Sequence, residues 1–551
     1  MTNMCCRTAA EWRLTLDKYN YWLENVTGDE KKTLLAMSED ERADSFYKDL
    51  EFGTGGLRGV MGLGTNRMNK YTVRRATQGL AREMLSHGAD FAARGVVIAY
   101  DSRNNSAFFA DEAARVLCAN GIKTYIFDSL RPTPELSFAV RYLKAARGIV
   151  ITASHNPKKY NGYKVYGEDG GQIPPAAAGK VTEFIEATDV FKDVKTGDNT
   201  AEVVGKNVDD AYIAAVLEQK MNVEIPKDFK VVYTPIHGSG NIPVRRILKE
   251  IGAENVLVVA EQEKPDGNFP TVRVPNPENR DVFDMAIELA SRENADIIIG
   301  TDPDSDRIGV VVKDKDGYFV LNGNQTGTLL AEFILKNTNP IPEKSKIVKT
   351  IVTTDMVESV AKAYGVGVDN VLTGFKFIGE KIKEYEKSGE HYIFGLEESY
   401  GYLKGTYARD KDAVVAAMLT VQMAADYKKQ GKTLAEGLSD LYKKYGCYAQ
   451  ELVSVTCEGM DGSEKIRGIM RDLRENPPAD KILDYSEGLD GLPKSNVLKY
   501  IMDDGWLVVR PSGTEPKIKI YFEMRGETTE AAKSRIETLK DKFMKRYIKS
   551  E

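Results

Sequence analysis

The stretch DIIIGTDPDSDR, residues 296–307, is the part of the sequence that best indicates the fold, because a short apolar strand ends in a cluster of aspartates. The same rhythm of buried strand and amphipathic helix occurs in three parts of the chain, at 95–152, 229–302 and 345–397. Strands that alternate with helices predict a mostly parallel sheet covered by helices, and ligands bind such sheets beyond the carboxyl ends of their strands. Each of the three parts carries a polar cluster at that place.

Length and composition exclude several protein classes. The 551 residues predict three to four domains, and 42% hydrophobic with 29% charged residues is typical of a globular protein. The net charge of −6 carries no basic stripe, which disfavours nucleic-acid binding. We find no apolar run long enough to cross a membrane and no secretory signal, so we expect a cytoplasmic protein. Five cysteines and four histidines without a CxxC pair make a structural zinc site improbable.

We predict four domains. Residues 1–205 form the first, with an N-terminal helical extension, and residues 206–322 and 323–445 form the second and third α/β domains. Residues 446–551 read as antiparallel strands followed by an amphipathic helix, so we expect a C-terminal α+β domain.

The aspartates of 300–307 predict a cation site. Asp302, Asp304 and Asp306 stand at every second position. Carboxylates that lie so near to one another repel unless a cation such as Mg²⁺ neutralises them. An EF-hand is excluded, because its sixth position would be Arg307 and its twelfth Lys313. A solvated acidic turn is the alternative.

The segment TASHNPKKYNGYKVYGEDGGQ, 152–172, offers a nucleophile. We expect Ser154 to lie exposed on a turn, with His155 and Lys164 nearby in sequence, as a nucleophile or phosphate acceptor. A hydrogen-bonding loop without chemistry is the alternative. The segment is not GxSxG, which disfavours a nucleophile-elbow hydrolase.

Two further segments suit a phosphorylated sugar. GLEESYGYLKG, 395–405, offers acceptors for sugar hydroxyls, although it could be an acidic turn. RPSGTEPKIK, 510–519, could form an anion-binding nest of backbone N–H groups beside Arg510, or a plain hairpin turn. QGKT, 430–433, fails as a nucleotide-binding P-loop, because Asp426 stands where that motif requires glycine. Together the clusters suit phosphoryl transfer to or from a phosphorylated polyol.

The motifs TASHNPKKYNGYK, GTDPDSDR, GLEESYG and RPSGTEPK, in this order, resemble the α-D-phosphohexomutase superfamily, and most of all its phosphoglucomutase branch with phosphopentomutase-like members. The resemblance extends from about Phe52 to Tyr521. It implies three mixed α/β domains and a fourth domain like the TATA-binding protein, arranged around a central cleft. It also implies interconversion of glucose 1-phosphate and glucose 6-phosphate through glucose 1,6-bisphosphate, with phosphopentomutase or phosphomannomutase activity as the alternative.

The resemblance also assigns roles to residues. Ser154 is implied to carry the phosphoryl group, and a phosphate oxygen on it to hold Mg²⁺ together with the three aspartates. Lys164 is the implied general base, with cationic neighbours that could lower its pKa. His237 matches a cleft-facing position, or else orients a loop. The implied sugar-phosphate contacts are Arg58, His155, Arg307, the specificity loop Gly374, Phe375 and Lys376, the hydroxyl-binding Glu397 and Ser399, the basic Arg409 and Lys411, and the phosphate-binding Arg510, Ser512, Gly513 and Thr514.

Two other classes of function compete with the mutase. A phosphatase of the haloacid-dehalogenase type would use Asp302 and Asp304, but it leaves 152–164 and 510–517 without a role. A non-enzymatic sugar-phosphate-binding protein is the other alternative. We expect small sugar phosphates as partners and a monomer or weak homo-oligomer, because a cleft between four domains can work within one chain.

Overall fold

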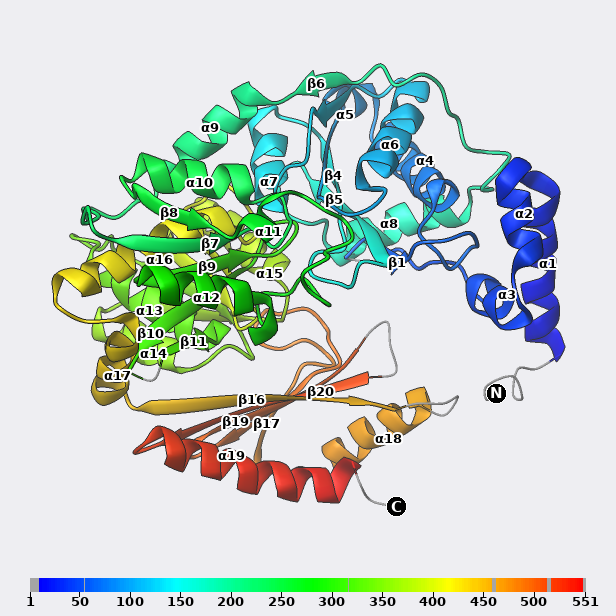
Figure 1. The fold of residues 1–551 in the computed structure, drawn as a ribbon. Helices are drawn as coiled ribbons and strands as arrows, with labels where there is room; N and C mark the ends of the chain where they lie inside the picture. Colours follow the sequence, from blue (N-terminus) through cyan, green and yellow to red (C-terminus); the bar gives the residue numbers. More distant parts are fainter. Residues whose placement is uncertain (1–8, 54, 316, 458–461, 513–516, 549–551) are drawn as a thin grey trace.

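The computed structural model describes residues 9–53, 55–315, 317–457, 462–512 and 517–548, which build four β-sheets (Figure 1). Each sheet and its helices are called a unit below, numbered in chain order. All four units share one apolar core that includes Val150 of the first, Ile299 of the second, Val348 of the third and Val508 of the fourth. The fourth unit also has a core of its own, to which Leu507 and Val509 contribute.

The first unit has a six-stranded mixed sheet. Its strands, in spatial order, are β1 (Leu57–Val60), β5 (Tyr160–Gly167), β4 (Arg147–Ile151), β2 (Val96–Tyr100), β3 (Thr124–Phe127) and β6 (Glu202–Val204). Its helices are α4 (Lys70–Ser86), α5 (Ala89–Ala93), α6 (Ser106–Ala119), α7 (Thr133–Tyr142) and α8 (Pro175–Glu186). Strands β4, β2, β3 and β6 run parallel, as the alternating pattern predicts, whereas β5 and β1 run antiparallel to their neighbours.

The predicted N-terminal helical extension is confirmed as three helices at the edge of the first unit (Figure 1). They are α1 (Ala9–Asn25), α2 (Gly28–Ala36) and α3 (Glu39–Phe46). Trp22 is 1% exposed and contacts the rings of Tyr71 and Phe191 edge-on, so the extension is anchored to the start and the end of the unit.

The second and third units repeat the pattern. The second sheet has the order β11 (Gly317–Leu321), β10 (Ile308–Asp314), β9 (Ile297–Thr301), β7 (Lys230–Thr234) and β8 (Asn255–Val258), with α9 (Lys206–Leu217), α10 (Asn241–Glu250), α11 (Ala260–Glu263), η1 (Arg280–Phe283) and α12 (Asp284–Glu293). The third has the order β13 (Gly367–Val371), β12 (Ser345–Thr350), β14 (His391–Glu397) and β15 (Gly401–Lys404), with α13 (Gly323–Lys336), α14 (Met356–Ala363), α15 (Phe375–Ser388), α16 (Ala413–Lys429) and α17 (Leu434–Tyr445). Helix α16 is buried for most of its length, which explains why its sequence lacks a polar face.

The fourth unit is an antiparallel sheet, as predicted. Its strands are β16 (Cys447–Thr456), β20 (Lys517–Gly526), β19 (Gly505–Pro511), β18 (Leu498–Met502) and β17 (Lys481–Asp484), with α18 (Gly462–Glu475), α19 (Thr529–Phe543) and the short η2 (Met544–Ile548). Helices α18 and α19 cover the face turned away from the other units (Figure 1). Among the described residues, none of the helices combines the length and the apolar character that crossing a membrane requires.

All four polar clusters occupy the same kind of position. Each lies where one strand turns into an antiparallel neighbour: β4 into β5, β9 into β10, β14 into β15, and β19 into β20. The sequence predicts antiparallel strands on both sides of the fourth cluster, whereas for the first and third clusters it predicts only a place beyond a strand end. Residues 513–516 of the fourth cluster lie outside the described residues.

Candidate active site

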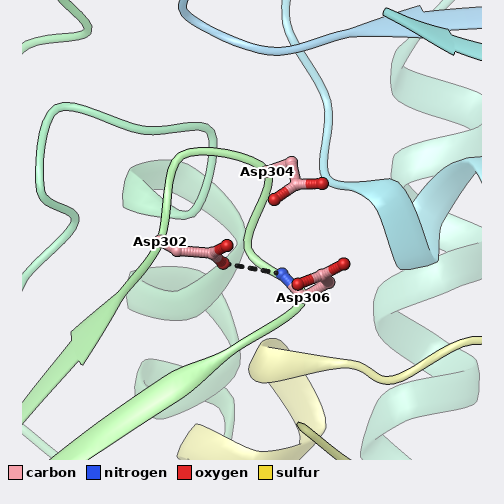
Figure 2. A group of neighbouring side chains, drawn as sticks. All are labelled: Asp302, Asp304 and Asp306. Atoms are coloured by element: carbon pink, nitrogen blue, oxygen red, sulfur yellow. Dashed lines mark hydrogen bonds between the residues drawn. The ribbon is translucent and has the colours of Figure 1, made fainter. Parts of the chain in front are cut away.

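The three aspartates of the β9–β10 hairpin form one compact group (Figure 2). One carboxylate oxygen of each lies within 4.8 Å of the others, and all three residues are at most 1% exposed. Oδ1 of Asp302 accepts hydrogen bonds from the backbone N–H groups of Asp306 (3.1 Å) and Arg307 (3.0 Å), which fixes the loop (Figure 2). This burial contradicts the solvated acidic turn.

Two carboxylate oxygens of the group have no donor. Oδ1 of Asp304 and Oδ1 of Asp306 are buried and have no hydrogen-bond partner among the described residues, although Nε of Arg307 lies 4.0 Å from Oδ1 of Asp306. Burial and the adjacent Asp304 carboxylate raise the pKa of Asp302 well above its ordinary value. Buried carboxylate oxygens without donors are what a hard divalent cation binds, so the residues fit a metal ion.

Ser154 lies directly against this group. It is in the β4–β5 hairpin, and its Oγ donates a hydrogen bond to Oδ2 of Asp302 at 3.0 Å and lies 3.2 Å from Nδ1 of His155. The residue is 4% exposed, not exposed as predicted, because the second unit covers the turn. Its φ of +51° is a left-handed conformation that costs energy in a residue other than glycine and is typical of functional turns.

Two lysines from other units also reach the aspartates. Nζ of Lys164, on β5, lies 3.0 Å from Oδ2 of Asp304 and 3.6 Å from Oδ2 of Asp306. Nζ of Lys411 lies 3.0 Å from Oδ2 of Asp306. The nearest charged partners of Lys164 are therefore carboxylates and not the cationic groups that we expected. The first three units meet at these ion pairs.

A buried network that the sequence analysis missed holds the serine turn. Nη2 of Arg103 donates to the backbone carbonyls of Ser154 and Asn156, and Nε of Arg103 lies 3.3 Å from Oδ2 of Asp101. The same Asp101 oxygen accepts from Thr152 Oγ1 (2.6 Å), and that hydroxyl accepts from the backbone N–H of Ser154 (2.7 Å). The available signal was YDSR at the carboxyl end of β2.

The aspartate group adjoins a cleft of about 840 Å³ between the four units. The predicted residues that line it are Arg58, His155, Arg307, Gly374, Phe375, Lys376, Glu397, Ser399, Lys411 and Arg510. Lining residues that the sequence analysis missed include Glu278, Glu398, Trp506, Lys519 and Tyr521. A cleft that combines several cations with carboxylates suits an anionic, hydroxyl-rich ligand.

The electrostatics of the cleft are unusual. Burial raises the pKa of Glu397 to about 7, and Oε1 of Glu397 accepts a hydrogen bond from the backbone N–H of Gly374 at 3.0 Å. Burial, followed by the cations Arg307 and Arg58, lowers the pKa of His155 well below its ordinary value, so His155 is neutral. Nη1 of Arg307 lies 2.6 Å from Oε1 of Glu278, so a phosphate that binds Arg307 would have to compete with this carboxylate.

Some predicted residues lie elsewhere. Arg409 is 2% exposed, and its guanidinium bonds the Glu386 carboxylate and the carbonyl of Thr406, away from the cleft lining. His237 orients a loop, because its ring nitrogens lie 3.1 Å from the carbonyl of Lys264 and 2.9 Å from Oγ1 of Thr271. The backbone N–H of Ser512 donates to the carbonyl of Lys517 at 2.7 Å. Gly513 and Thr514 lie outside the described residues.

The comparisons with known proteins match four successive parts of the chain, which correspond to the four units. Models of the phosphoglucomutase/phosphomannomutase family match α/β/α domain I at residues 49–191, domain II at 210–317, domain III at 322–445 and the C-terminal domain at 454–540. A curated phosphoglucomutase of Staphylococcus aureus (strain USA300) is 38% identical over 537 residues, which cover 93% of this chain and 96% of the relative.

Two solved structures share the fold. Paramecium pp63/parafusin, a phosphoglucomutase in an open form, aligns with a TM-score of 0.69 at 17% identity and covers 92% of this chain and 97% of its own. Aspergillus fumigatus N-acetylphosphoglucosamine mutase, in complex with GlcNAc-6P and magnesium, aligns with a TM-score of 0.51 at 14% identity and covers 97% and 99%. Since the family models match most of the sequence and the curated relative covers nearly all of it, this chain belongs to the phosphoglucomutase/phosphomannomutase family.

Proposed function

We propose that this chain is a phosphoglucomutase that interconverts α-D-glucose 1-phosphate and glucose 6-phosphate through a phosphoserine at Ser154. The observation that carries the proposal is the 3.0 Å contact between Ser154 Oγ and Asp302, beside two carboxylate oxygens without donors. A nucleophilic hydroxyl next to a cation site is the arrangement that phosphoryl transfer needs.

In the proposed reaction the phosphoryl group moves from Ser154 to the 6-hydroxyl of glucose 1-phosphate. The bond from phosphorus to Oγ breaks, and a bond to the sugar oxygen forms. The hydroxyl proton passes to Lys164, which acts as a base only as the neutral amine, after it has given up the proton of the ammonium form that pairs with Asp304 and Asp306. The glucose 1,6-bisphosphate turns over within the cleft, and its other phosphoryl group returns to Ser154 as the 6-phosphate leaves. Mg²⁺, when bound by Asp302, Asp304 and Asp306, supplies charge stabilisation for the transferred phosphoryl group.

The cleft residues bind and orient the sugar phosphate. We assign the sugar hydroxyls to Glu397 and Ser399, because both line the cleft and Glu397 accepts a hydrogen bond in a buried setting. We assign the phosphate that is not transferred to Arg510 with Ser512, Gly513 and Thr514. Arg58, His155, Arg307 and Lys411 line the same cleft and would contact the reacting phosphate, and the 374–376 loop would read the sugar.

The proposal also covers the sugar, the metal ion, the domain bounds, the location and the oligomeric state. The Staphylococcus aureus relative supports glucose over the alternatives, which are phosphopentomutase and phosphomannomutase activity. The magnesium in the Aspergillus structure supports Mg²⁺ as the ion. We keep the domain division 1–205, 206–322, 323–445 and 446–551, a cytoplasmic location, and a monomer or weak homo-oligomer as parts of the proposal.

The test is ³¹P NMR of the purified protein with glucose 1-phosphate, Mg²⁺ and a trace of glucose 1,6-bisphosphate. We expect the 1-phosphate signal to convert to the 6-phosphate signal without free phosphate. Ser154→Ala should abolish the conversion and leave folding intact, whereas the exposed Ser86→Ala should convert at the wild-type rate. Near-full conversion by Ser154→Ala would refute the mechanism, and release of inorganic phosphate would favour a phosphatase.

A further inference from the structure

A second cavity lies where the first two units meet, outside the cleft. It has a volume of about 250 Å³ and is lined from four parts of the chain: residues 129–135, helix α9, residues 238–246 at the start of α10, and Pro265. The apolar lining residues are Leu130, Tyr212, Ile213, Ile242, Pro243 and Pro265. Cavities at domain junctions with an apolar wall and few polar groups are where small molecules bind.

One of the polar residues that line this cavity is Glu135 of α7, which is 2% exposed; the others are Ser129, Arg131, Asp209, Ser239, Asn241 and Arg246. Oε1 of Glu135 has no hydrogen-bond partner among the described residues, and the nearest cation, Nε of Arg131, is 3.8 Å away. A buried carboxylate without a donor costs stability unless something neutralises it. Oε1 of Glu135 is therefore a buried acceptor without a donor, although Asp209 and Arg131 both lie close to this carboxyl group.

Glu135 shares its nearest cation with two closer carboxylates. Arg131 is engaged by Asp209, through Nε and Nη2 at 2.8 and 2.9 Å, and by Asp128 at 2.9 Å. The other lining cation, Arg246, lies 2.8 Å from Asp210, a residue that Lys206 also contacts. Burial, followed by the neighbouring Asp209 and with Asp412 also contributing, raises the pKa of Glu135 well above its ordinary value. The raised pKa favours the protonated form of Glu135, and a cation bound beside Oε1 would displace that proton.

We propose that this cavity is a binding site for a small organic ammonium ion, whose charged nitrogen meets Glu135 and whose apolar body contacts Leu130, Ile213 and Pro243. At roughly 30 Å³ for each water-sized atom, the cavity holds about eight non-hydrogen atoms. The ammonium would form a charge-assisted hydrogen bond to Oε1 of Glu135, the buried lining carboxylate oxygen that accepts no hydrogen bond among the described residues.

Residues in and beside the lining of the cavity form hydrogen bonds with the loop that carries Asp302, Asp304 and Asp306. Thr133, two residues before Glu135, donates to Asp304 twice, from its N–H to the carbonyl (2.9 Å) and from Oγ1 to Oδ2 (2.8 Å). Ser239, which lines the cavity, donates to the carbonyl of Pro303 from both its N–H and its Oγ, each at 2.9 Å. A ligand that shifts either wall therefore shifts the loop, so we infer that the site regulates the proposed Mg²⁺ binding, an inference that rests on the proposed function.

Calorimetric titration with benzylamine, which has a size of about eight non-hydrogen atoms, tests the binding. We expect a dissociation constant on the order of 1 mM, proton release that appears as a dependence of the heat on the buffer, and at least about tenfold weaker binding of the neutral isostere benzyl alcohol. Glu135→Gln should weaken benzylamine binding by about tenfold or more, whereas Glu112→Gln, a buried glutamate of α6 outside the cavity, should leave it within about twofold.

If benzyl alcohol bound as tightly as benzylamine, or if Glu135→Gln left the affinity for benzylamine unchanged, the proposed site would be wrong. The comparison of the two ligands uses the wild-type chain, so it does not depend on whether a variant folds. The coupling is tested by repeating the benzylamine titration with saturating Mg²⁺. A change of at least about threefold in affinity supports regulation, and an unchanged value refutes it. Neither measurement uses mutase activity, so its outcome is distinguishable from a failure of the proposed function.

Discussion

Replacing Arg103 by glutamine should damage both stability and catalysis, and the structure allows the two effects to be separated. The substitution removes the donors to the Ser154 and Asn156 carbonyls and leaves the fully buried Asp101 without its cation. Removing one partner of a buried ion pair costs about 3–5 kcal/mol. Ser154 would also lose part of what holds its left-handed conformation, and a displacement of about 1 Å at a reacting group costs about 10²-fold in rate.

The matched control is Arg147→Gln in the same unit. Arg147 is also buried, and its Nη2 lies 2.7 Å from Oε1 of the buried Glu83, but its side chain forms no hydrogen bond or ion pair with the described residues of the serine turn. Both variants should melt roughly 10 °C below the wild type in thermal unfolding, at about 2–4 °C for each kcal/mol. Only Arg103→Gln should reduce kcat, by about 10²-fold with KM nearly unchanged, in steady-state assays at a temperature where both variants are folded. Equal kcat in the two variants would refute the positioning role.

Two other predictions concern the metal site and the contact between the third and fourth units. Asp306→Asn removes a charged oxygen ligand, so the Mg²⁺ concentration for half-maximal mutase rate should rise at least about tenfold, while the exposed Asp314→Asn should not change it. Burial, followed by the neighbouring Asp355, raises the pKa of Glu523 from 4.5 to about 7. Between these two pH values the folded state keeps a proton that the unfolded state loses. Stability should therefore fall between about pH 4.5 and 7, by on the order of 3 kcal/mol from this group, and urea unfolding of Glu523→Gln should show a smaller fall; an equally steep fall in the variant would contradict the assignment.

The parts of the site that the sequence predicts are those encoded locally. The spacing of Asp302, Asp304 and Asp306 predicts a cation site, and Ser154 lies in a segment rich in turn residues. What the sequence could not predict depends on partners far along the chain. Arg103 acts through backbone carbonyls about fifty residues away, which leave no trace in side-chain spacing.

The errors have the same physical origin. The middle of the 152–172 segment forms strand β5, but its residues are buried on both faces, so the alternation that marks a half-exposed strand is missing. Arg409 lies two residues from Lys411 in a buried loop, and the two side chains have different partners: Glu386 for Arg409 and Asp306 for Lys411. Basic character alone could not separate them.

The meeting of three units at Asp306 has a consequence for how the protein is made. During synthesis Ser154 and Lys164 leave the ribosome first. The three aspartates follow about 140 residues later, and Lys411 follows about a hundred residues after the aspartates. Until Lys411 emerges, the Asp306 carboxylate lacks one of the two lysines that contact it in the finished protein. A nascent chain that stops before the third unit is complete therefore has the serine and the aspartates but not the charge balance that lets them be buried together, and activity should appear late in synthesis.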